Sequence, residues 1–145
     1  MRYYKLLIFL LLSSSSISGI AQNNTPLKPC PKSPNCVSTL ESKGRKKMSV
    51  LPFIGDLEKS KTKLKEIVLT IKGATLVVEE SNYLHFEFST SMGKFIDDVE
   101  FYFDESTQHI HFRSASRIGY GDFGANKRRM KKITKLWKSH LKYTI

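Results

Sequence analysis

The sequence predicts an α+β fold in which a four-stranded antiparallel meander carries two helices packed on one face. Residues 75–116 contain four segments in which apolar and polar side chains alternate, which is typical of strands with one buried face. Residues 56–72 and 126–143 repeat their apolar side chains every three or four positions, which is typical of helices with one apolar stripe. Because these helices flank the sheet in the chain, they are expected to cover its apolar face.

The first 21 residues have the pattern of a cleaved secretory signal. Arg2 and Lys5 precede a seven-residue apolar run, and small residues lie at the end of the segment. A membrane-spanning helix needs about 20 apolar residues, so residues 1–21 are expected to be removed on export, with a retained anchor as the alternative. The expected location of the mature protein is the periplasm or the exterior of the cell.

Basic residues outnumber acidic residues in the chain as a whole. The chain has 24 Lys and Arg against 13 Asp and Glu, a formal net charge of +11, and removal of Arg2 and Lys5 lowers it to +9. Such a charge favours an anionic ligand or a cell-envelope partner over nucleic acid in an exported protein, and peripheral contact with an anionic membrane is one form of it. Simple solubility is the alternative explanation. The oligomeric state does not follow from the sequence.

Residues 22–52 are expected to form an irregular arm ahead of a single domain at residues 53–145. Prolines concentrate in this arm and disfavour helix interiors and central strands. Cys30 and Cys36 are the only cysteines; five residues separate them, and no His lies nearby to complete a zinc site. A disulfide that pins the arm to the domain is therefore expected in an exported chain.

Both predicted helices have recognisable boundaries and faces. Asp56 is the expected N-cap of the first helix and Gly73 its expected stop. Its apolar stripe, with lysines opposite, consists of Leu57, Leu64, Ile67, Val68 and Ile71. The stripe of the second helix consists of Met130, Ile133, Trp137, His140 and Leu141. The rest of the second helix is basic, so it would suit a membrane surface if Trp137 were exposed.

The strands are expected at residues 75–80, 83–89, 95–103 and 109–116. Ser81 and Asn82 form a two-residue hairpin signal, and Gly93 lies in the following turn. Matching the apolar faces places Phe101 opposite Phe112 in the last pair of strands, and Phe88 opposite Val99 in the middle pair. The polar pairs that follow are Glu100 with Arg113, Tyr102 with His111, Glu87 with Glu100, His85 with Tyr102, and Ser89 with Asp98.

The sheet face away from the helices is therefore expected to be polar. It gathers Glu87, Asp98, Glu100, Arg113, His85, His111 and Tyr102. Such a cluster could perform acid–base chemistry or hold a metal, or it could be a solvated ladder of ion pairs. The spacing contains no metal-binding motif, and Ser114 and Ser116 lack a GxSxG elbow. We therefore expect no metal, no other cofactor and no serine hydrolase.

The glycine-rich turn that precedes the last helix is the second candidate site. It contains Gly119, Gly121 and Gly124, and Asp122 or Asn126 could cap the helix. A helix N-terminus favours anions, so the nearby Arg117, Lys127 and Arg128 indicate a pocket for phosphate or carboxylate. The alternative is a tight connection in which Asp122 takes up the free amides or pairs with Arg117.

Three segments of the sequence resemble one family. PCPKSPNCVST at 29–39, FIDDVEF at 95–101 and RSASRIGYGDFGANKRR at 113–129 are similar to motifs of the DUF1499 family, an uncharacterised family of bacterial and plastid proteins. The resemblance implies no activity. By position, the motif residues include Asn35, Asp97, Ser114, Ser116, Asp122, Asn126 and Arg129.

Together these observations predict an exported, non-catalytic binding or scaffold module that recognises an anionic group. The candidate ligand-binding residues are Asp98, Glu100, Arg113, Arg117, Asp122, Asn126 and Arg128. The alternative is a small enzyme that uses the acid, arginine and histidine cluster on the open sheet face.

Overall fold

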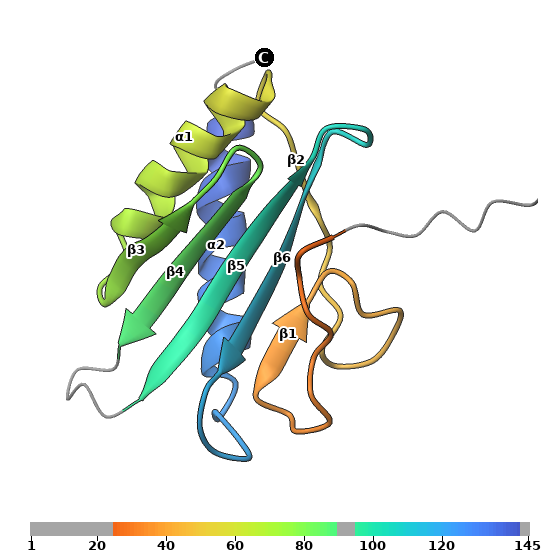
Figure 1. The fold of residues 1–145 in the computed structure, drawn as a ribbon, viewed down its shortest axis with the longest axis vertical. Helices are drawn as coiled ribbons and strands as arrows, with labels where there is room; N and C mark the ends of the chain where they lie inside the picture. Colours follow the sequence, from red (N-terminus) through yellow and green to blue (C-terminus); the bar gives the residue numbers. More distant parts are fainter. Residues whose placement is uncertain (1–24, 90–94, 143–145) are drawn as a thin grey trace, which may run out of the picture.

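A computed structural model describes residues 25–89 and 95–142, so the signal-like segment and the turn at Gly93 lie outside the described residues. Two helices lie against one face of an antiparallel sheet (Figure 1). The elements are β1 (Cys36–Ser38), β2 (Leu51–Pro52), α1 (Leu57–Leu69), β3 (Ala74–Glu79), β4 (Tyr83–Ser89), β5 (Ile96–Asp104), β6 (His109–Ser116) and α2 (Ala125–Leu141). The strand order is β1-β6-β5-β4-β3, and β2 also pairs with β6.

The expected four-stranded meander is present, but the sheet has six strands. The two additional strands, β1 and β2, come from the segment at residues 22–52 that was expected to be irregular. Both pair with β6, with Val37 opposite Ser114 and Leu51 opposite Ile110. All three residues of β1 are buried and β2 has only two residues, so neither strand shows the alternation by which a strand is recognised.

The core lies between the sheet and the helices. Inward-facing side chains of β4, β5 and β6 pack against Leu64, Ile67 and Val68 of α1 and against Met130, Ile133 and Trp137 of α2. Trp137 is fully buried, and its Nε1 donates to the carbonyl oxygen of Pro52 at 3.0 Å. The hypothesis that α2 lies on a membrane required this side chain to be exposed and is therefore wrong. His140, expected in the buried stripe, is exposed.

Local contacts set the ends of α1. Asp56 is its N-cap, and its carboxylate accepts a hydrogen bond from the Lys59 amide at 2.8 Å, as predicted. The helix ends at Leu69 rather than Lys72, and Gly73 follows with a φ of +89°. A Cβ at Gly73 would lie 2.5 Å from the Ser89 carbonyl oxygen, so a glycine is needed where α1 returns to the sheet. Lys61 is buried and donates to Glu58 and two carbonyls.

The register is as predicted in one pair of strands and wrong in the next. Between β5 and β6, Glu100 lies opposite Arg113 and Tyr102 opposite His111. Between β4 and β5, Val99 pairs with Phe86 rather than Phe88. A two-residue slip keeps every side chain on its own face, so the alternation of apolar residues could not distinguish the two registers.

Within the described ranges, no helix combines the length and the apolar character that crossing a membrane requires.

Candidate functional site

The predicted disulfide joins Cys30 to Cys36 and closes the loop that leads into β1. Beside it, the buried side chain of Asn35 holds this arm against the glycine-rich turn. Asn35 Nδ2 donates to the Gly119 carbonyl oxygen at 2.6 Å, and the Asn35 carbonyl oxygen accepts from Asn126 Nδ2 at 3.1 Å and from the Ser116 amide at 3.0 Å. The arm and the turn therefore form one rigid unit, although they are far apart in the sequence.

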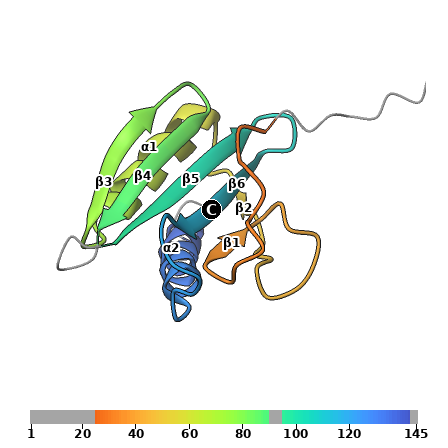
Figure 2. The same cartoon turned by 60° about the horizontal axis from the view of Figure 1, so that its bottom comes forward.

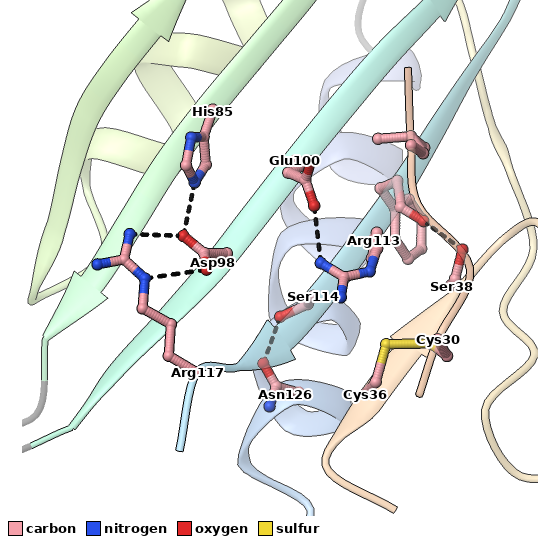
Figure 3. A network of polar contacts seen from close by, with 12 residues as sticks. Cys30, Cys36, Ser38, His85, Asp98, Glu100, Arg113, Ser114, Arg117 and Asn126 are labelled. Atoms are coloured by element: carbon pink, nitrogen blue, oxygen red, sulfur yellow. Dashed lines mark hydrogen bonds and ion pairs between the residues drawn. A yellow bond between two sulfur atoms is a disulfide. The ribbon is translucent and has the colours of Figure 1, made fainter. Parts of the chain in front are cut away.

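A buried polar cluster extends this unit beneath the sheet. Arg129 Nη2 lies 2.5 Å from Asp97 Oδ2, and Arg129 Nη1 donates to Asn126 Oδ1 at 2.8 Å. The same Asn126 oxygen accepts from Ser114 Oγ at 2.6 Å (Figure 3). The Arg129 guanidinium also lies over the Phe88 ring, 4.6 Å from its centre. The three sequence motifs thus meet at one end of the molecule.

The sequence contained a signal for part of this cluster that the prediction did not use. Asp97 lies two residues before Val99 and therefore on the helix-covered face of β5. An acid on an apolar face needs a charged or hydrogen-bonding partner, and the structure supplies Arg129. Ser114 and Asn126 have no comparable signal, because small polar residues are common at helix–sheet contacts.

The open sheet face carries two ion-pair groups, as Figure 3 shows. Asp98 accepts from His85 Nε2 at 2.7 Å and from Arg117 Nη2 at 2.8 Å, and Arg117 also contacts Glu87. In the second group, Arg113 Nη1 lies 2.8 Å from Glu100 Oε2. Tyr83 donates its hydroxyl to Glu100 Oε1 at 2.8 Å. Each carboxylate therefore already has a basic or hydroxyl partner.

The pKa shifts of Asp98 and Tyr83 agree with the hydrogen-bonded network on this face. Burial raises the pKa of Asp98, but hydrogen bonds from Arg117 and His85 outweigh it and hold the pKa below its usual value. Burial, followed by the hydrogen bond to Glu100, raises the pKa of Tyr83 far above its usual value. Burial lowers the pKa of His111. The pKa values of Asp98 and Tyr83 are shifted away from neutral pH, which does not suit a general acid or base at that pH.

The glycine-rich turn follows the structural alternative rather than the anion pocket at the helix end. The Asp122 carboxylate accepts from the Gly124 amide at 2.9 Å and from the Asn126 amide and Asn126 Nδ2, both at 2.8 Å. Although burial raises the pKa of Asp122, these hydrogen bonds hold it below its usual value. Arg117, expected beside the helix, instead lies on the open face. The start of α2 therefore holds the chain's own carboxylate.

Beside this turn, however, a cleft of about 610 Å³ opens between the arm and α2. We call it the basic cleft. Its basic lining residues are Lys32, Lys43, Arg45, Lys46 and Lys127, and its other side-chain walls include Tyr120, Asp122 and Phe123. Most of the basic lining residues lie in the arm that was expected to be irregular, where the sequence analysis placed no site. Because the two walls come from distant segments, no local pattern indicated that they meet.

The seven predicted ligand-binding residues therefore do not form one site. Asp98, Glu100, Arg113 and Arg117 are neutralised in pairs on the open face. Asp122 and Asn126 hold the start of α2. Arg128 is exposed next to the turn and donates to the Phe123 carbonyl oxygen at 2.5 Å.

Within residues 25–89 and 95–142, no group of three or more His, Cys, Asp or Glu side chains is arranged to hold a metal ion.

Comparison with known proteins agrees with the motifs. The family model described as a protein of unknown function, DUF1499, matches residues 26–136, which include all six strands and most of α2. The comparisons with curated proteins and with solved structures give no match. The chain therefore belongs to the DUF1499 family.

Proposed function

We propose that this protein is a non-catalytic binding module that holds an anionic group in the basic cleft. The observation that carries the proposal is the composition of the cleft walls. Five basic side chains from three separate segments line one hollow, with Asp122 as the only acidic lining residue. The Asp122 carboxylate offsets one of these five charges, so the lining keeps a formal net charge of +4.

Several of these cations have no partner among the residues that the structure describes. Among the described residues, the side chains of Lys32, Lys43 and Arg45 make no hydrogen bond or ion pair. Like charges brought into one hollow repel each other, and the repulsion is relieved when an anion enters. The remaining two cations are oriented by the chain itself: Lys127 Nζ donates to the Arg45 carbonyl oxygen at 3.1 Å, and Lys46 Nζ donates to that of Pro31.

The open sheet face is less suited to binding an anion than the basic cleft. Its arginines are paired with acids, which leaves little net charge to attract a ligand. A small enzyme that used these acids would require the pairs to break first. The binding proposal needs no such rearrangement, because the cleft is already open and positively charged.

Export is part of the same proposal. The disulfide between Cys30 and Cys36 supports an oxidising compartment, since such bonds persist there and are rare in the cytosol. An exported cationic module would encounter anionic groups of the cell envelope, which suits the cleft.

The test is a titration with inorganic phosphate and with pyrophosphate, followed by NMR of the backbone amides. Shifts should concentrate at residues 43–46 and 120–127 and should weaken as salt is added, because salt screens charge. The variant Lys32→Gln/Lys43→Gln/Arg45→Gln should lose these shifts while remaining folded, since these side chains make no described contact.

A matched control removes the same charge elsewhere. Lys131, Lys135 and Lys138 line a separate groove on α2, and none makes a described ion pair. The variant Lys131→Gln/Lys135→Gln/Lys138→Gln should keep the shifts in the basic cleft. If the control abolishes anion binding and the cleft variant does not, the proposed site is wrong.

A further inference from the structure

The turn between β6 and α2 presents apolar side chains to solvent. Ile118 is 66% exposed, Tyr120 80% and Phe123 98%. By contrast, the phenylalanines of β4, β5 and β6 are packed in the core. Ile118, Tyr120 and Phe123 lie within one short turn, and we call them the apolar tip. Exposed apolar groups of this kind mark surfaces that contact a partner or a membrane.

The backbone of Phe123 adopts a conformation that a bulky residue disfavours. Phe123 has a φ of +50°, a region that a bulky residue rarely adopts. Contacts on both sides hold it there: Arg128 donates to its carbonyl oxygen, and Asp122 accepts from the amide of Gly124. The side chain gains no packing in return, because almost all of its surface is in solvent. A strained backbone conformation that neighbouring contacts maintain, without any gain in packing for the side chain, indicates that Phe123 has a role other than stabilising the fold.

The apolar surface continues inward from the tip. A hollow of about 280 Å³ lies beside it, lined in part by Ile118, Phe123 and the half-exposed Phe95, which precedes β5. Phe123 therefore lines both this hollow and the basic cleft.

The tip also borders the basic cleft directly. Tyr120 and Phe123 line the cleft together with the five basic residues, and the exposed Arg128 adds a sixth cation next to Phe123. Figure 2 shows this end of the molecule, with the turn that leads into α2 beside the arm that carries β1. An apolar projection bordered by cations, with one internally bonded acid, thus forms a single surface.

We infer that this end of the molecule docks on an anionic lipid bilayer, with the apolar tip in the interface and the basic cleft on the headgroup phosphates. The inference rests on the proposed function, because it names the anion that the cleft would hold. The combination carries it: exposed apolar side chains and cations adjoin on one surface, which matches a bilayer whose phosphates surround an apolar interior. Aromatic side chains such as Tyr and Phe suit the interface.

A protein partner fits the surface less well. A specific protein interface needs an acid placed against each of these cations and a pocket for Phe123. A membrane of anionic lipids offers anionic phosphates and an apolar interior at every point of its surface.

The first experiment uses the chain from Gln22 onward, which contains every contact described above, with Phe123→Trp as a fluorescent probe. Vesicles of phosphatidylglycerol and phosphatidylcholine should shift the emission of this tryptophan to the blue, and brominated lipids should quench it. Trp137 is buried in the core and supplies a constant background. Vesicles of phosphatidylcholine alone should produce neither change. A probe that stays in water with anionic vesicles overturns the inference.

The second experiment compares variants by co-sedimentation with the same vesicles. Ile118→Ser/Tyr120→Ser/Phe123→Ser and Lys32→Gln/Lys43→Gln/Arg45→Gln should each weaken binding by at least about tenfold, because insertion and charge both contribute. The matched control, Leu69→Ser/Val77→Ser, removes apolar side chains that are 49% and 45% exposed on other surfaces. It should bind as the parent does. Equal loss in the control overturns the inference.

The two proposals fail in different ways. If phosphate and pyrophosphate still shift the amides of the basic cleft while anionic vesicles bind no better than neutral ones, the membrane inference is wrong and the proposed function stands. If neither soluble anions nor vesicles act on the cleft, both are wrong.

Discussion

The side chains of Asp97 and Arg129 form an ion pair across the interface between sheet and helix, and both are largely buried. Removing one partner leaves the other charge without compensation in a site of low polarity, which costs roughly 3–5 kcal/mol. Arg129→Met should therefore lower the free energy of unfolding by about that amount. Chemical denaturation followed by circular dichroism measures it.

The control for this prediction is the double variant Asp97→Asn/Arg129→Met. It removes both charges, so most of the lost stability should return. If the double variant is as unstable as Arg129→Met, then the packing of Arg129 on Phe88, rather than the ion pair, accounts for the effect.

The disulfide should stabilise the arm to a modest extent. In the chain-entropy model, a loop as short as that between Cys30 and Cys36 contributes about 2 kcal/mol. Cys30→Ser/Cys36→Ser should therefore lower the free energy of unfolding by about 2 kcal/mol and leave the sheet intact. Thermal denaturation of the variant, and of the parent with and without reductant, tests this. A reduced parent as stable as the oxidised one contradicts the prediction.

The pKa of Asp98 gives stability a defined pH dependence. It lies below the value of about 3.9 of an unfolded aspartate, so ionisation favours the folded state. That stabilisation is present above about pH 4 and is lost as the pH falls through the lower, folded-state pKa. The difference in unfolding free energy between parent and Asp98→Asn should therefore shrink between about pH 5 and pH 2. Denaturation curves across this range measure it, and a constant difference would falsify the prediction.

Phe123 should contribute nothing to folding. Glycine adopts its positive φ without steric strain, so Phe123→Gly should leave the free energy of unfolding unchanged or raise it by up to about 1 kcal/mol. By contrast, Phe101→Ala in the core should lower it by about 3–5 kcal/mol. Denaturation and vesicle binding are measured on the same samples. A clear loss of stability in Phe123→Gly means that the ring supports the fold.

The main layers of the fold follow from the sequence because they depend on local patterns. Alternation in β5 and β6 predicted both the strands and their register, and spacing of three and four predicted both helices. The short strands β1 and β2 could not be predicted in this way. They form because β6 offers them an unpaired edge, which is a property of the folded sheet and not of residues 36–52 themselves.

The candidate site was harder to predict for a related reason. The sequence correctly predicted that Glu100 lies opposite Arg113 on the open face. Composition alone does not reveal that the charges on this face cancel in pairs. The basic cleft has walls from both ends of the chain, and only tertiary structure brings Lys32 beside Lys127. Sequence patterns identify faces of single elements, whereas this cleft is formed between elements.

The pairing of β1 with β6 has a consequence for when binding becomes available. One wall of the cleft is synthesised early and the other only near the end of the chain, so the contacts that join them, such as Asn35 with Gly119, are of long range and form late. A chain that has not yet been synthesised as far as α2 has no complete cleft. The proposed anion binding therefore requires both walls of the cleft to be folded together.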